Sequence, residues 1–191
     1  ATGALCVMCK DVAVSLTSTQ IGAIAENLIA NELMIESNGR LSPFQPIADD
    51  DGIDVLIYDK ITGDAVPIQV KARTNTINKP GKQERGNTVH FEVRKTTHND
   101  ERRALLLCIL LSEDLRTTER AWLLPLEGLS SLTSERSNKY VIRANKQLST
   151  NDKYKRFQCA SVHEVASRLV SYFENTRNKL SKRDTLMHAP S

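Results

Sequence analysis

The hydrophobic and polar positions along the chain predict two long helices separated by a series of strands. Apolar residues recur every three or four positions over residues 17–37, which is typical of an amphipathic helix. Ser18 or Thr19 would cap its start, and Asn38-Gly39 would end it. Residues 162–180 show the same spacing, so we expect a second amphipathic helix there.

Strands are expected between the helices. Residues 53–59 and 65–72 flank the turn residues Thr62-Gly63-Asp64, which predicts an antiparallel hairpin. Residues 105–111 are apolar throughout, as in a strand that is covered on both faces. We also expect an edge strand or loop at 41–45, strands at 89–94, 121–126 and 140–144, a short helix at 126–132 and a long loop over 74–87. This order of helix, strands and helix is an α/β layer arrangement.

Charge divides the chain into an acidic and a basic part. Residues 136–191 contain twelve Lys or Arg and four Asp or Glu, a net charge of +8, whereas residues 1–135 carry −5. We therefore expect an α/β core over residues 1–135 and a basic C-terminal extension over residues 136–191, with a long amphipathic helix, packed on the same domain. The extension could attract phosphate backbones, but a solvated surface without any partner explains its charge equally well.

Several classes of protein are disfavoured by the sequence. No apolar run is long enough to cross a bilayer, and the first residues lack the pattern of a signal peptide, so we expect no membrane association. The four cysteines form no disulfide framework, which favours the cytoplasm. Cys6 and Cys9 form a lone C-x-x-C pair, short of a zinc site, and Cys108 belongs to a core strand. We find no phosphate-binding loop or dinucleotide motif, so no organic cofactor is expected.

The candidate chemistry lies on the predicted hairpin. Gln69 and Lys71 project from the same face of their strand, and the hairpin brings Asp54 beside Gln69. A carboxylate and an amide oxygen suit Mg²⁺ or Mn²⁺, and a lysine beside the metal can stabilise charge on a phosphate. Glu26 on the first helix could assist as a proton acceptor. Taken singly, these residues could equally be a surface acid, an edge-strand lysine and a solvated helix residue.

Together, Glu26, Asp54 after glycine and isoleucine, and Gln69-Val70-Lys71 resemble the PD-(D/E)XK nuclease superfamily of restriction endonucleases and Holliday junction resolvases. The resemblance implies a restriction-endonuclease-like α/β fold with a central mixed β-sheet flanked by helices, spanning roughly residues 19–126. It implies that Asp54 and Gln69 are metal ligands, Lys71 the catalytic lysine and Glu26 an accessory acid. Ile53 replaces the family's proline, and Gln69 replaces its second acid, which should lower metal affinity.

We therefore expect a Mg²⁺-dependent DNA endonuclease that acts as a homodimer, since cutting both strands is easiest with twofold symmetry. Arg73, Lys79, Lys82 and Arg85 follow the site and could contact phosphates. Two alternatives stay open. One is a nuclease-like protein that binds DNA without cutting it. The other is an interaction module whose basic helix, residues 162–183, docks on a protein.

Other polar candidates have simpler interpretations. Asp49-Asp50-Asp51 is expected to be an exposed acidic loop rather than a second cation site. His90 and His98 have no partner acid at a useful spacing and are interpreted as surface histidines. Trp122 lies among apolar residues and is expected in the core rather than as a platform for stacking bases.

Overall fold

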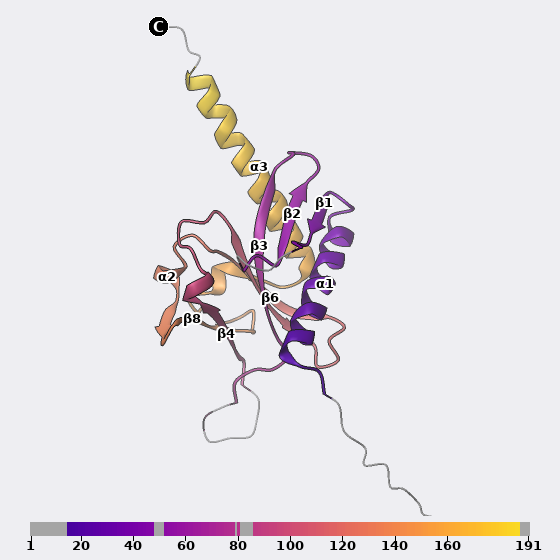
Figure 1. The fold of residues 1–191 in the computed structure, drawn as a ribbon, viewed down its shortest axis with the longest axis vertical. Helices are drawn as coiled ribbons and strands as arrows, with labels where there is room; N and C mark the ends of the chain where they lie inside the picture. Colours follow the sequence, from indigo (N-terminus) through magenta and orange to yellow (C-terminus); the bar gives the residue numbers. More distant parts are fainter. Residues whose placement is uncertain (1–14, 48–51, 79, 81–85, 188–191) are drawn as a thin grey trace, which may run out of the picture.

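The computed structural model describes residues 15–47, 52–78, 80 and 86–187, which form two β-sheets and two long helices (Figure 1). The elements along the chain are α1 (Ser18–Glu36), β1 (Leu41–Phe44), β2 (Val55–Asp59), β3 (Ala65–Arg73), β4 (Thr88–Arg94), η1 (Lys95–Thr97), β5 (Leu105–Leu111), β6 (Thr118–Pro125), α2 (Leu129–Leu132), β7 (Ser134–Arg136), β8 (Lys139–Asn145), η2 (Lys155–Phe157), β9 (Gln158–Cys159) and α3 (Val162–Met187). No helix among the described residues is long and apolar enough to cross a membrane.

The large sheet is mixed and has six strands in the order β1-β2-β3-β5-β6-β9. Strands β3 and β5 run parallel, and the other neighbouring pairs are antiparallel. Helices α1 and α3 pack against each other and cover one face of this sheet. A small sheet, β4-β8-β7, covers part of the other face. The expected central mixed sheet flanked by helices is thus confirmed, and a second sheet covers the face that the helices leave open.

The N-cap of helix α1 lies one residue before the first of the two predicted caps. Thr17 is the N-cap: its Oγ1 accepts the backbone N–H of Gln20 at 3.2 Å, and Gln20 Oε1 accepts the Thr17 N–H at 2.8 Å. The prediction of Ser18 or Thr19 was wrong because this reciprocal pairing needs a glutamine three residues after the cap. The apolar stripe of the helix is buried at Ala25, Ile29 and Leu33.

The β2–β3 hairpin is confirmed. Gly63 makes the turn with a φ of +77°, a conformation that favours glycine. The strands pair with Val55 opposite Ile68 and Tyr58 opposite Ala65. Next to this hairpin lies β5, whose seven residues are all buried, as expected for a strand covered on both faces.

The strand predicted at 89–94 belongs to the small sheet, not to the central one. Its observed counterpart, β4, pairs only with β8 within the described chain. The resemblance, which spans roughly residues 19–126, implied that the strands after the hairpin fit the central sheet, and this was wrong for β4, because an alternating pattern fixes which face is buried but not which strand is the partner. Inward-facing Val89, Phe91 and Val93 pack with Trp122, which is fully buried as expected.

Residues from the basic C-terminal stretch complete both sheets. Strand β8 pairs with β4, and β9 pairs with β6. Helix α3 starts at the predicted Val162 and continues to Met187, beyond the predicted end. Its first half packs on the large sheet, and its second half projects away from the sheets (Figure 1).

Candidate active site

Asp54 directly precedes β2 and lies two residues after a glycine with a left-handed backbone conformation. Gly52 has a φ of +66°, which a residue with a side chain would adopt only with strain. The Asp54 N–H then donates to the Ile68 carbonyl at 3.0 Å, extending the β2–β3 ladder by one bond. The Asp54 carboxylate turns along the sheet, where its Oδ2 accepts the Val70 N–H at 2.5 Å. Asp54 is therefore held against the middle of the Gln69-Val70-Lys71 segment.

Gln69 and Lys71 lie on the face of β3 that carries the small sheet. In the parallel pairing Gln69 is opposite Leu106 and Lys71 is opposite Cys108, and both partners belong to the core beneath the small sheet. Val70 points to the opposite face, into the core under the helices. The spacing thus places the amide and the ammonium on one face, on either side of the backbone amide that binds Asp54.

Strand β3 is an interior strand, which removes the simplest alternative interpretation of its lysine. It pairs with β2 on one side and with β5 on the other. Lys71 therefore does not protect a sheet edge from aggregation. Burial raises the pKa of the neighbouring Cys108 thiol, while the positive charges of Lys71 and Arg73 act to lower it. These two cations consequently lie close to an apolar core.

Gln69 is one of three buried polar or charged side chains in the described chain, at 4% exposure. Arg40 binds the buried Asp59, and Gln158 donates its amide to the Asn145 carbonyl at 2.9 Å. Those two groups have evident structural roles. Gln69 differs because it lies next to the residue whose backbone N–H binds the Asp54 carboxylate.

Glu26 on α1 is brought near Asp54, but neither Gln69 nor Lys71 is among the residues that line their common cavity. Glu26 lines this cavity of about 270 Å³ together with Asp54, so the helix acid and the hairpin acid face one space. The other lining residues are Ala23, Asn27, Gln45, Pro46 and Ile53. Sequence reasoning missed Asn27 and Gln45. Asn27 follows Glu26 directly and Gln45 precedes a proline, but neither position carries a pattern that would single it out.

The donor set suits a hard divalent cation that keeps most of its water. Asp54 supplies carboxylate oxygen and Gln69 amide oxygen, and Mg²⁺ takes only one or two protein carboxylates. No group of three or more His, Cys, Asp or Glu side chains in the described ranges could hold a metal ion. The residues therefore fit magnesium or manganese and do not fit a zinc centre, which needs several nitrogen or sulfur ligands.

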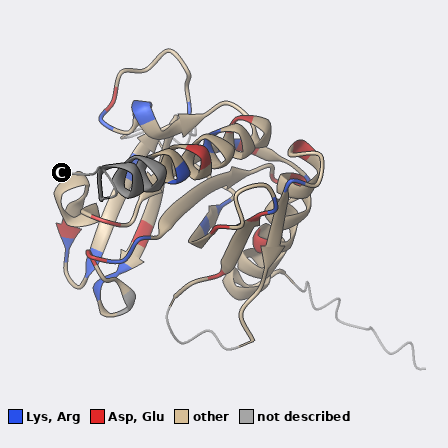
Figure 2. Ribbon diagram, turned by 90° about the horizontal axis from the view of Figure 1, so that it is seen from above, with Lys and Arg blue, Asp and Glu red and all other residues tan. Residues whose placement is uncertain are grey.

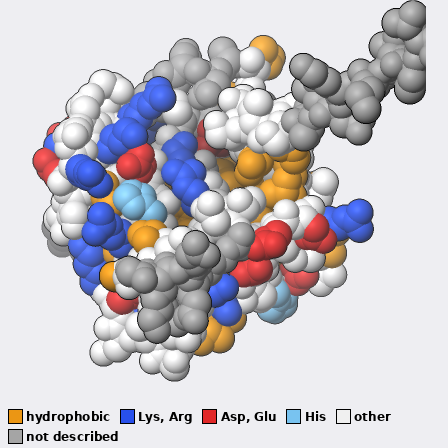
Figure 3. Space-filling model, turned by 90° about the horizontal axis from the view of Figure 1, so that it is seen from below, with side chains coloured by type: hydrophobic (Ala, Val, Ile, Leu, Met, Phe, Trp, Pro, Cys, Tyr) orange, Lys and Arg blue, Asp and Glu red, His pale blue; other side chains and the backbone are white. Residues whose placement is uncertain are grey.

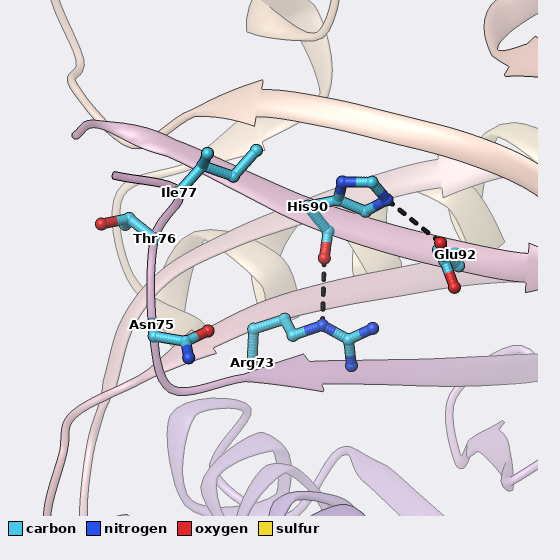
Figure 4. Close-up of a pocket in the computed structure, with 6 residues that line it drawn as sticks. All are labelled: Arg73, Asn75, Thr76, Ile77, His90 and Glu92. Carbon is cyan, nitrogen blue, oxygen red and sulfur yellow. Dashed lines mark hydrogen bonds and ion pairs between the residues drawn. The ribbon is translucent and has the colours of Figure 1, made fainter. Parts of the chain in front are cut away.

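Arg73 continues the same face of β3 but is held by backbone groups. Its Nε donates to the His90 carbonyl and its Nη1 to the Ala72 carbonyl, each at 3.0 Å. It lines a second cavity, of about 370 Å³, between the end of β3 and strand β4 (Figure 4). The other predicted phosphate contacts, Lys79, Lys82 and Arg85, lie outside the described residues, as do Asp49-Asp50-Asp51, Cys6 and Cys9.

The prediction that His90 and His98 have no partner acid was wrong, and His98 is not a surface residue. His90 Nε2 lies 3.3 Å from Glu92 Oε1, and His98 Nε2 lies 2.9 Å from Asp100 Oδ1. The His98 side chain is only 3% exposed. Both partner acids are two residues downstream, a spacing that brings His90 and Glu92 to the same face of β4.

Comparisons with known proteins support the fold alone. No family model matches the chain, and no curated protein matches its sequence. Among solved structures, the chain is similar to a bacterial homing endonuclease, I-Ssp6803I, with a TM-score of 0.55 and 13% sequence identity. The similarity covers 86% of this chain and 99% of that one. The chain thus has a nuclease-like α/β fold.

Proposed function

We propose that this protein is a metal-dependent DNA endonuclease with a Q-x-K variant of the PD-(D/E)XK site. The observation that carries the proposal is the hydrogen bond from the Val70 N–H to the Asp54 carboxylate, because it brings the acid to the segment that bears Gln69 and Lys71. Glu26 shares a cavity with Asp54. The nuclease-like fold supports the same conclusion, since the similar solved structure is a homing endonuclease.

Asp54 and Gln69 would hold Mg²⁺ or Mn²⁺. When bound, such an ion polarises a phosphoryl oxygen and makes water a better nucleophile at neutral pH. The contribution of the protein is to keep the two oxygen donors in place. The Val70 N–H restrains the rotation of the Asp54 carboxylate, and burial restrains the Gln69 amide.

The remaining side chains act on the phosphodiester and on water. A water oxygen forms a bond to phosphorus as the opposite ester P–O bond breaks. The Lys71 ammonium stabilises the negative charge that develops on the phosphoryl oxygens. The Glu26 carboxylate accepts a proton from the attacking water, and the departing oxygen takes a proton from solvent.

A plasmid assay tests the proposal. Supercoiled plasmid is incubated with the protein in Mg²⁺, in Mn²⁺ and in EDTA, beside the variants Lys71→Ala and Lys60→Ala. We expect metal-dependent nicking by the wild type and a loss of about a hundred- to a thousandfold in Lys71→Ala, by analogy with removal of one charge-stabilising group. Lys60 is exposed in the turn of the same hairpin, so its variant should cut normally.

The outcomes separate the alternatives. DNA binding without nicking in either metal would identify a non-cleaving nuclease-like protein. Equal nicking by wild type and Lys71→Ala would assign the activity to another site or to a contaminant. No binding to DNA at any ionic strength would remove DNA as the substrate and favour a protein-interaction module.

A further inference from the structure

The outer face of the small sheet carries basic side chains that the proposed active site does not use. Val89, Phe91 and Val93 turn inward and are fully buried, so the alternate residues of β4 turn outward. Across the strand pair, His90 lies opposite Arg143 and Arg94 lies opposite Lys139. Figure 2 shows how Lys and Arg (blue) and Asp and Glu (red) are distributed over the helices, strands and loops.

A cavity of about 250 Å³ opens on this face at the β7 end. Three of its lining residues are the exposed cations Arg136, Arg143 and Lys153, and the others are Ser134, Glu135, Val141 and Tyr154. Tyr154 is 2% exposed and forms a rigid wall. The Lys153 ammonium lies 5.1 Å from the centre of the Tyr154 ring, so this cation is held over the cavity wall.

The charge of this cavity is not neutralised by neighbouring acids. Arg136, Arg143 and Lys153 take part in none of the ion pairs formed by the described residues. The one acid in the lining, Glu135, is paired with Lys95. Three cations around one opening therefore favour an anionic ligand.

The pairing of β4 with β8 relates this cavity to the one between β3 and β4. The cavity between β3 and β4 is lined by Arg73 and His90, and His90 lies opposite Arg143 across β4 and β8. Glu92, which lines the cavity together with Arg73 and His90, has a lowered pKa because Lys139 donates a hydrogen bond to its carboxylate. Figure 3 shows Lys and Arg side chains gathered around a histidine on this side of the molecule.

We propose that the outer face of β4, β8 and β7 binds the backbone phosphates of duplex DNA next to the cleaved position, with Arg136, Arg143 and Lys153 as the contacts. Arg136 and Arg143 come from the neighbouring strands β7 and β8, and Lys153 comes from the segment after β8. Cations from three separate segments around one opening suit the repeated charges of a polyanion better than a single small anion. The inference rests on the proposed action on DNA and assigns that substrate a second contact surface.

Salt-dependent binding tests this surface. A labelled duplex is titrated by fluorescence anisotropy in EDTA, where no cleavage occurs, over a series of KCl concentrations. The triple variant Arg136→Gln, Arg143→Gln, Lys153→Gln is compared with wild type and with Arg116→Gln. The Arg116 side chain is 85% exposed on the β5–β6 loop and serves as a matched control.

We expect the plot of log affinity against log salt to be less steep in the triple variant by between about two and three, since each phosphate contact contributes about 0.9. Arg116→Gln should match wild type, and all variants should keep the wild-type unfolding midpoint. An unchanged slope in the triple variant overturns the proposal. So does a poly-glutamate peptide that competes as well as DNA at equal charge, because the ligand would then be an acidic protein surface.

Nicking of plasmid separates this inference from the proposed function. If wild type binds duplex through these residues but never nicks in Mg²⁺ or Mn²⁺, only the assignment of cleavage fails. If wild type nicks plasmid and the triple variant binds with an unchanged salt slope, cleavage stands and this surface is excluded.

Discussion

The carboxamide at position 69 gives the candidate site one negative charge fewer than an acid would. Gln69 is buried, at 4% exposure, and lies beside the segment that holds the Asp54 carboxylate. If Gln69 is a metal ligand, as proposed, its neutral amide can stay in place without a metal at little electrostatic cost, whereas a second carboxylate beside Asp54 would be repelled. We therefore expect the glutamine to lower the metal affinity and to stabilise the metal-free protein.

Replacing Gln69 with glutamate should therefore raise the metal affinity and lower the stability of the metal-free protein. We expect Gln69→Glu to lower the melting temperature in EDTA and to show a larger gain in melting temperature on addition of Mg²⁺ than wild type. A ligand at ten times its dissociation constant stabilises a protein by about 1.4 kcal/mol. Melting curves over a Mg²⁺ series would measure this, with Gln147→Glu as an exposed control of equal charge. If Mg²⁺ shifts all three proteins equally, Gln69 is not a metal ligand.

At the scale of elements, one buried ion pair joins the start of the large sheet to α3. Arg40 donates its Nε and Nη2 to the two oxygens of Asp59, at 2.8 and 2.9 Å. Its Nη1 donates to Glu174 at 2.9 Å. The Asp59 side chain is fully buried, and the hydrogen bonds from Arg40 lower its pKa from 3.8 to about 2. The pair therefore ties β2 to the part of α3 that begins to leave the sheets.

Acid should weaken this pair within a defined pH range. Because the pKa of Asp59 is lower in the folded protein, its contribution is complete above pH 3.8 and is lost as the pH falls toward 2. The shift corresponds to about 2 kcal/mol. Urea unfolding should show Asp59→Asn less stable than wild type at pH 7 and nearly equal to it at pH 2. Asp64→Asn is the control in the same hairpin, and a pH-independent difference for Asp59→Asn would contradict the assignment.

The elements themselves could be predicted largely from the sequence. Helical spacing located α1 and α3, and alternation with turn chemistry located the β2–β3 hairpin, because these patterns depend on local geometry. The two-residue strand β9 and the three-residue strand β7 were missed, since such short segments carry no periodicity. The partner of β4 was missed because pairing between distant segments is set by tertiary packing.

The same distinction between local sequence pattern and tertiary packing applies to the candidate site. Asp54 and Gln69 lie on one hairpin, so the register brings them together and the sequence alone could predict it. The cavity that Glu26 shares with Asp54 depends on how α1 packs on the sheet, which residue spacing does not specify. His98 was misread for a related reason, because its burial results from the fold of the β4–β5 connection.

At the scale of the whole molecule, each chain offers one Asp54 site, whereas a duplex has two strands. We therefore expect two copies, related by a twofold axis, to be needed for a double-strand break. Plasmid should be nicked at low protein concentration, and the linear form should rise more steeply than the nicked form as protein is added. An excess of Lys71→Ala protein should suppress the linear product more than nicking. Linear product that forms directly at high dilution would contradict this.

Because β3 lies between β2 and β5, its pairing register decides which of its side chains face the helices and which face the small sheet. The same strand buries Ile68 and Val70 under the helices and presents Gln69 and Lys71 on the opposite face. A slip of one residue would put the amide and the ammonium into the core under the helices and the two aliphatic side chains in their place. A misregistered chain would thus be unstable and would lack the proposed site, so a stably folded molecule has Gln69 and Lys71 on the side where the proposal needs them.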